Sequence, residues 1–192
     1  QISEIFFMLL VPFFFRKLGV KWMILVGMLA WVLRYVLFAY GATEQAVWML
    51  FAGIALHGIC YDFFFVTGFM YADRVAPPAL RGQTQSMLVF FTQGVGMFVG
   101  FKVAAAKFAP VAESSTALGS AITAAKSEEK LSFFQQMGRM FSVNMPESVD
   151  ASLISQSAQL WKQYWLFPAG MAAVIAVIFF VAFWDKSAEK DS

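Results

Sequence analysis

Residues 22–40 read WMILVGMLAWVLRYVLFAY, an apolar run in which Arg34 is the only charged side chain. About 20 consecutive apolar residues are enough for a helix to cross the hydrocarbon core of a bilayer. The run therefore predicts a transmembrane helix. Because an isolated charge at membrane depth is costly, we expect Arg34 to have a partner or a function.

Four other segments approach or reach the same length, and they are residues 1–15, 46–71, about 83–101 and 164–184. We therefore predict an all-α polytopic membrane protein with five transmembrane helices. The first segment is short, and Gln1 opens it with no helix cap and no signal peptide before it. We expect that an N-terminal part of the protein is missing from this chain.

The composition supports lipid as the solvent of this chain. The 192 residues are 60% hydrophobic and 14% charged, and 23 of them are Phe. Soluble domains are about 45–50% apolar and about 25% charged. The net charge of +2, with no Lys/Arg-rich block, does not indicate nucleic-acid binding. A single cysteine, Cys60, excludes an internal disulfide.

The connections between the segments set the expected orientation. Basic residues concentrate in residues 16–21 and 72–82, which predicts that these two connections are cytoplasmic. The tail 185–192 then lies in the cytoplasm as well. Residues 109–163 are long and polar, and we expect an external loop with one or two short helices, because residues 131–141 have amphipathic spacing.

Four ionisable residues lie inside the predicted spans: Glu4, Arg34, His57 and Asp62. At a rise of about 1.5 Å per residue, each lies roughly 14–21 Å from the cytoplasmic end of its span. The hydrocarbon core is about 30 Å thick, so all four fall near one level at the midplane. Charged groups at that depth are usually functional or paired.

The spacing of these residues also assigns them to faces. Gln1 and Glu4 are three apart and share one helical face, whereas His57, Tyr61 and Phe65 follow i, i+4, i+8 on another. An amide and a carboxylate opposite a phenol and a phenyl ring could hold a polar solute that carries a ring.

Structural readings of the same residues stay open. Arg34 could form a buried ion pair with Asp62 or Glu4, and His57 could bond a neighbouring carbonyl. Tyr61 and Phe65 could simply pack or face lipid.

Three strings, QISE (residues 1–4), AWVLRY (30–35) and HGICYDFFFVTG (57–68), carry a resemblance to a known family. The chain resembles the nucleoside:proton symporter family of the major facilitator superfamily over residues 1–108 and in its last helix. The resemblance implies a twelve-helix transporter in two halves. Residues 1–108 would supply helices 8–11, residues 109–163 an external loop, residues 164–184 helix 12, and residues 185–192 a cytoplasmic tail.

The resemblance further implies a nucleoside site between the halves. Gln1 and Glu4 would hydrogen-bond the ribose or base, and Tyr61 and Phe65 would pack against the nucleoside. The partners are then the nucleoside, protons, the bilayer and the missing N-terminal half. The expected location is the inner or plasma membrane, with no cofactor, no metal and no enzymatic activity.

Coupling to protons needs a group whose protonation responds to the open side. We favour Asp62 for the proton and Glu4 for the substrate, with His57 and Arg34 tuning them. Three other readings stay open. They are a transporter for another polar solute such as an oligosaccharide, an intramembrane enzyme with a metal held by His57, Asp62 and Glu4, and a fragment or scaffold that does not transport.

Overall fold

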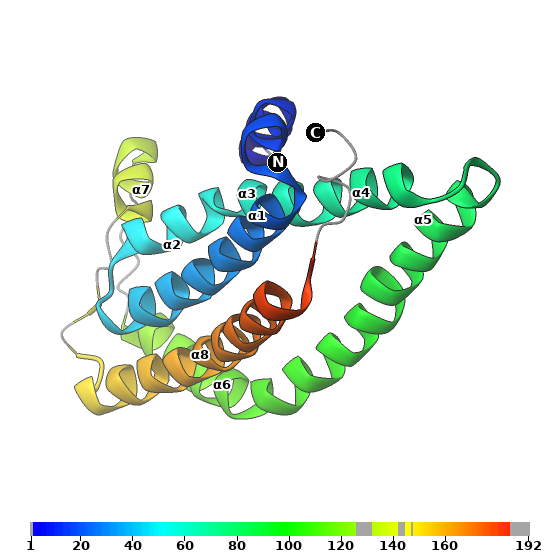
Figure 1. The fold of residues 1–192 in the computed structure, drawn as a ribbon. Helices are drawn as coiled ribbons and strands as arrows, with labels where there is room; N and C mark the ends of the chain where they lie inside the picture. Colours follow the sequence, from blue (N-terminus) through cyan, green and yellow to red (C-terminus); the bar gives the residue numbers. More distant parts are fainter. Residues whose placement is uncertain (1, 126–131, 142–144, 147, 185–192) are drawn as a thin grey trace.

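The computed structural model describes residues 2–125, 132–141, 145–146 and 148–184. Four helices in this part of the chain are long and apolar enough to cross a membrane, and they are Ser3–Thr43, Val47–Val75, Pro78–Ala125 and Ala151–Ala182. The predicted all-α polytopic fold is therefore confirmed. Figure 1 shows the helix of residues 78–125 arching away from the others, and a short helix standing at one end of the molecule.

The first helix, α1 (Ile2–Thr43), is long enough for two crossings. Its 42 residues would measure about 63 Å if straight, twice the thickness of a bilayer core. It is broken at Gly19, whose φ of 71° and ψ of 173° are not helical, and the chain changes direction there (Figure 1). Glycine suits this position because positive φ is strained for other residues. Residues 2–18 form a first arm and residues 20–43 a second arm, which accounts for the first two predicted spans.

The next span is a composite of four short elements. These are α2 (Val47–Ala55), α3 (His57–Tyr61), the π-helix η1 (Asp62–Val66) and α4 (Thr67–Val75). A π-helical turn carries one extra residue and often occurs at functional positions. Here it lies in the middle of the span and contains Asp62 and Phe65.

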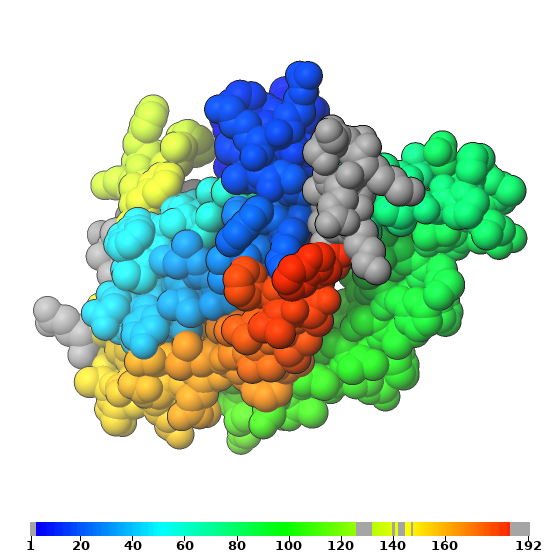
Figure 2. Space-filling view, in the orientation of Figure 1, coloured from blue at the N-terminus to red at the C-terminus, as the bar shows by residue number. Residues whose placement is uncertain are grey.

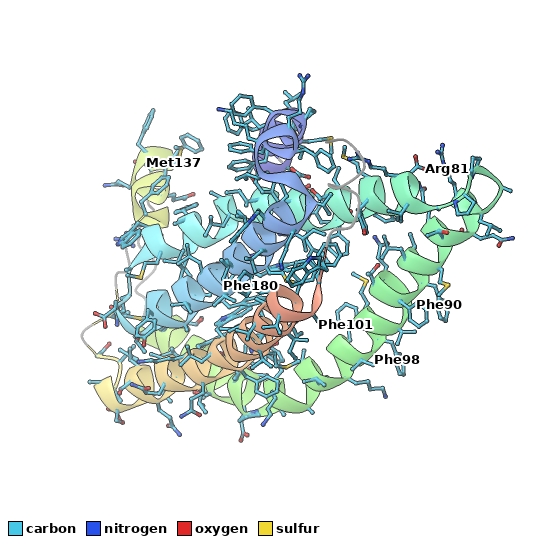
Figure 3. The ribbon with its side chains drawn as sticks, in the orientation of Figure 1. Arg81, Phe90, Phe98, Phe101, Met137 and Phe180 are labelled. Carbon is cyan, nitrogen blue, oxygen red and sulfur yellow. The ribbon has the colours of Figure 1, made fainter. Side chains whose placement is uncertain are left out.

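The remaining elements form a long arch and a final helix. The arch consists of the 3₁₀ turn η2 (Pro78–Leu80), α5 (Arg81–Val89), the π-helix η3 (Phe90–Gly96) and α6 (Met97–Ala125). The short helix α7 (Phe133–Met140) follows, and α8 (Ala151–Ala182) packs along the second arm of α1. Figure 3 labels Phe90, Phe98 and Phe101 along the arch, and all three are exposed.

Helices extend into the range 109–163 that we expected to be a loop. α6 continues to Ala125 and α8 begins at Ala151. Residues 103–125 are rich in alanine, a strong helix former. Thr116, Ser120 and Thr123 donate their hydroxyls to the carbonyl oxygen four residues earlier, so these polar side chains are satisfied within the helix.

Two buried clusters hold the spans together. In one, Val20, Ile24, Leu25 and Met28 of the second arm pack with Ala176 of α8. In the other, Val11 of the first arm and Met23 of the second pack with Phe63 of η1. The two arms of α1, helix α8 and the composite span therefore share one core.

Lysines over aromatic rings lie near both ends of the bundle. Lys21 lies over the rings of Phe180 and Trp184, and Lys162 lies over Tyr40. Long basic side chains and aromatic rings are typical of the two membrane interfaces. From Lys21 to Tyr40 the second arm rises about 28 Å, close to the thickness of the hydrocarbon core. The level of Tyr40 and Lys162 is called the Tyr40 level below.

Glycine permits the closest helix contact. A Cβ on Gly58 of α3 would lie 2.6 Å from the backbone oxygen of Ser3, and a Cβ on Gly27 would lie 3.0 Å from the backbone nitrogen of Phe64. Both arms of α1 therefore pack directly against the backbone of the composite span.

We predict that Gly58→Val destabilises the fold. The added side chain would meet backbone atoms that cannot move aside, and overpacking of this kind costs about 1–3 kcal/mol. The measurement is the melting temperature of the purified full-length protein in detergent. Gly170→Val is the control, because no neighbouring atom lies within 4 Å of a Cβ built there. Equal melting temperatures for the two variants would contradict the predicted contact.

Candidate functional site

Three ionisable side chains meet in a chain of contacts between three segments. Arg34 Nη1 of the second arm contacts His57 Nδ1 of α3 at hydrogen-bonding distance. On the other side of the ring, His57 Nε2 lies 3.3 Å from Glu4 Oε1 of the first arm. The structure thus brings together three of the four ionisable residues that the sequence places inside the spans. This chain is called the Glu4–His57–Arg34 bridge.

The chemistry of the bridge fixes the state of its histidine. A guanidinium group only donates hydrogen bonds, so His57 Nδ1 must accept from Arg34 and carries no proton. The proton of a neutral imidazole then resides on Nε2, which donates to the Glu4 carboxylate. His57 is therefore a neutral link between a fixed cation and an anion.

The bridge is accessible at its carboxylate end. The side chains of His57 and Glu4 are 40% and 27% exposed. At the other end the Arg34 Nε atom is buried and has no hydrogen-bond partner among the described residues. A solute reaching this site would therefore meet Glu4 and His57, with Arg34 behind the imidazole.

Aromatic rings continue the wall next to the bridge. The ring centroids of Tyr61 and Phe65 lie 5.1 Å apart, and those of His57 and Tyr61 lie 6.2 Å apart. The face expected from i, i+4, i+8 spacing is therefore present. Tyr61 is exposed, so one ring of this wall is open to a bound solute.

Sequence reasoning missed Trp31 in this wall. Its ring lies 5.8 Å from Phe65 and nearly perpendicular to it. Trp31 precedes Arg34 by three residues, so both lie on one face of the second arm. That spacing was the available signal for including Trp31 in the site.

Asp62 is buried in a different environment. It is 0% exposed, and neither of its carboxylate oxygens has a hydrogen-bond partner among the described residues. A buried polar group without a partner is costly, and the cost is much greater for a charge. The possible ion pair between Arg34 and Asp62 is therefore wrong, because Arg34 bonds to His57 instead.

Gln1, the other predicted substrate residue, lies outside the described residues. Within the described ranges, no group of three or more His, Cys, Asp or Glu side chains is placed to hold a metal ion.

Comparison with known proteins gives a consistent family match. The family model described as "Nucleoside H+ symporter" matches residues 1–128. The putative nucleoside transporter YegT of Escherichia coli K12 is 31% identical over 191 residues, which is 98% of this chain and 36% of that protein. The nucleoside permease NupG of the same strain is 36% identical over 101 residues, 52% of this chain and 24% of NupG.

A third relative is the xanthosine permease of Escherichia coli K12, which is 27% identical over 184 residues, 95% of this chain and 34% of that protein. No solved structure matches the chain. The chain spans about a third of the length of YegT and the xanthosine permease. The resemblance seen in the sequence is confirmed, and the chain belongs to the nucleoside H+ symporter family.

Proposed function

We propose that the full transporter containing this chain takes up nucleosides together with protons by alternating access. The observation that carries the proposal is the Glu4–His57–Arg34 bridge beside the Tyr61–Phe65 ring pair, inside membrane spans of this family. The names of the relatives, a nucleoside permease and a xanthosine permease among them, support a nucleoside as substrate. On this reading the protein is a transporter and not an enzyme.

The substrate site of the proposal lies at the exposed end of the bridge. Glu4 accepts hydrogen bonds from ribose hydroxyls or from the base edge, and Gln1, three residues earlier in the sequence, supplies an amide. Tyr61 and Phe65 pack against the flat base, because offset or edge-to-face ring contacts favour aromatic partners. The opposite wall comes from the N-terminal half of the transporter.

Asp62 is the proposed proton carrier. Its unpartnered carboxyl group favours the neutral acid when the site is closed, and contact with water allows the proton to leave. The location we propose is the inner or plasma membrane, with the C-terminus in the cytoplasm. The basic side chains of residues 16–21 support this orientation.

A transporter for an oligosaccharide is the second candidate, because carboxylates and aromatic rings also bind sugars. Competition separates the two candidates. Excess unlabelled nucleoside, and not excess oligosaccharide, is expected to inhibit the uptake of labelled uridine into vesicles that contain the full transporter.

Glu4→Gln is expected to weaken nucleoside binding by about 10–100-fold. Hydrogen bonds to a charged group contribute about 1.5–3 kcal/mol, and the amide replaces the charge without changing the shape. The measurement is the Kd of uridine for the purified full transporter. Glu113→Gln makes the same chemical change at an exposed position and should leave the Kd unchanged. If both variants bind like the wild type, Glu4 is not a substrate residue.

Asp62→Asn is expected to separate transport from the proton gradient. The amide cannot carry a proton, so the variant should exchange nucleoside across the membrane without concentrating it. Proteoliposomes measured in counterflow and under an inward proton gradient test both activities. Asp150→Asn is the control, because Asp150 is the exposed N-cap of α8 and Asn also caps helices well. Concentrative uptake by the Asp62 variant would rule out its role in coupling.

Substitutions of His57 test whether the bridge matters for substrate binding. His57→Leu removes both contacts and should weaken uridine binding, because Glu4 is no longer held in place. His57→Gln offers an acceptor toward Arg34 and a donor toward Glu4, so it should retain more affinity than the Leu variant. Equal affinities of the two variants would argue that His57 only fills space.

A further inference from the structure

Helix α7 has two chemically different faces. At 100° per residue, Phe133, Phe134 and Met137 project into one sector of the helix, and Gln135, Gln136 and Arg139 into the opposite one. The apolar side chains are open: Phe133 is 68% exposed, Phe134 83% and Met137 44%. The transport site makes no use of this pattern, which the sequence already indicated over residues 131–141.

The start of α7 is fixed by a reciprocal cap. The Ser132 side chain accepts a hydrogen bond from the Gln135 backbone N–H, and the Gln135 side chain accepts one from the Ser132 backbone N–H. A capping box satisfies two backbone donors that a short helix would leave unpaired. The cap fixes the residue at which α7 begins, and the helical spacing from that residue places the side chains on the two faces.

The position of α7 places its apolar face next to the membrane-spanning surface. Phe141, at the end of the helix, lies with its ring centroid 5.5 Å from that of Phe51 in α2. Phe51 belongs to the span Val47–Val75, about 6 Å along the helix from its first residue. Trp48, one turn earlier, is 64% exposed. Figures 1 and 2 show α7 standing beside the end of α2, and Met137 is labelled on it in Figure 3.

We propose that α7 lies at the membrane–water interface of the Tyr40 level, with its apolar face in lipid. Phe141, which follows α7, contacts the exposed Phe51 in the first turns of α2, and α2 starts just after the Tyr40 level. A helix with large apolar side chains on one face and polar ones on the other settles at the boundary of headgroups and acyl chains. The ligand of this surface is the bilayer itself, and its polar face remains in water.

Spin labels on the two faces of α7 test this proposal. Phe134→Cys places the label on the apolar face, and Gln136→Cys is the matched control two residues away on the polar face. The variants are made in the full transporter with Cys60 and any other native cysteine replaced, and the labelled protein is reconstituted into phosphatidylethanolamine–phosphatidylglycerol nanodiscs. Collision rates are measured with oxygen, which concentrates in lipid, and with a water-soluble nickel chelate.

The proposal expects the label at position 134 to collide more with oxygen than with the nickel chelate, and the label at position 136 to do the reverse. Phe133→Cys is a second apolar-face position and should behave like position 134. Two labels equally open to nickel would place α7 in water and overturn the proposal. A label at position 134 protected from both reagents would place that face against protein and would also overturn it.

Discussion

The cost of leaving a polar group unpaired in lipid is the constraint on which the rest of this structure depends. Glu4, His57 and Arg34 come from three different helical segments and satisfy one another across the bundle. The small residues Gly58 and Gly27 let those segments approach closely enough for the contacts to form. The helix packing and the candidate site are therefore one arrangement, since moving any of the three segments would break the bridge.

The two carboxyl groups of the site differ in environment, and this difference supports separate roles for them. Glu4 contacts His57 and is partly exposed, so a solute can reach its carboxyl group. Asp62 is fully buried and has no hydrogen-bond partner in the described ranges. Two ionisable groups of one site often have different roles when their surroundings favour different protonation states. In the proposed mechanism, the accessible anion binds the nucleoside and the buried acid carries the proton.

The sequence was sufficient to locate the spans, and it named candidate site residues without settling how they pair. Hydropathy located the membrane helices, and the shared depth of Glu4, Arg34, His57 and Asp62 placed them at one level. The sequence offered Asp62 or Glu4 as the partner of Arg34 and a carbonyl for His57, whereas the structure pairs Arg34 with His57. The rotation of α3 and η1 about the helix axis decides which side chain faces Arg34. This rotation depends on the π-helical turn, and no residue pattern indicates such a turn. Trp31 was missed because an aromatic residue in an apolar helix is more often a packing residue.

In the proposed mechanism, the π-helical turn is the element that links the site to the motion of alternating access. It begins at Asp62, directly after the segment that carries His57 and Tyr61. A helix bends or shifts register most easily where its regular hydrogen bonds are interrupted. A carboxylate accepts several hydrogen bonds, so a ribose hydroxyl can donate to Glu4 while His57 Nε2 keeps its contact. In the proposed mechanism, the bridge holds Glu4 in place for the substrate, while proton binding at Asp62, one residue beyond α3, changes the charge at the turn.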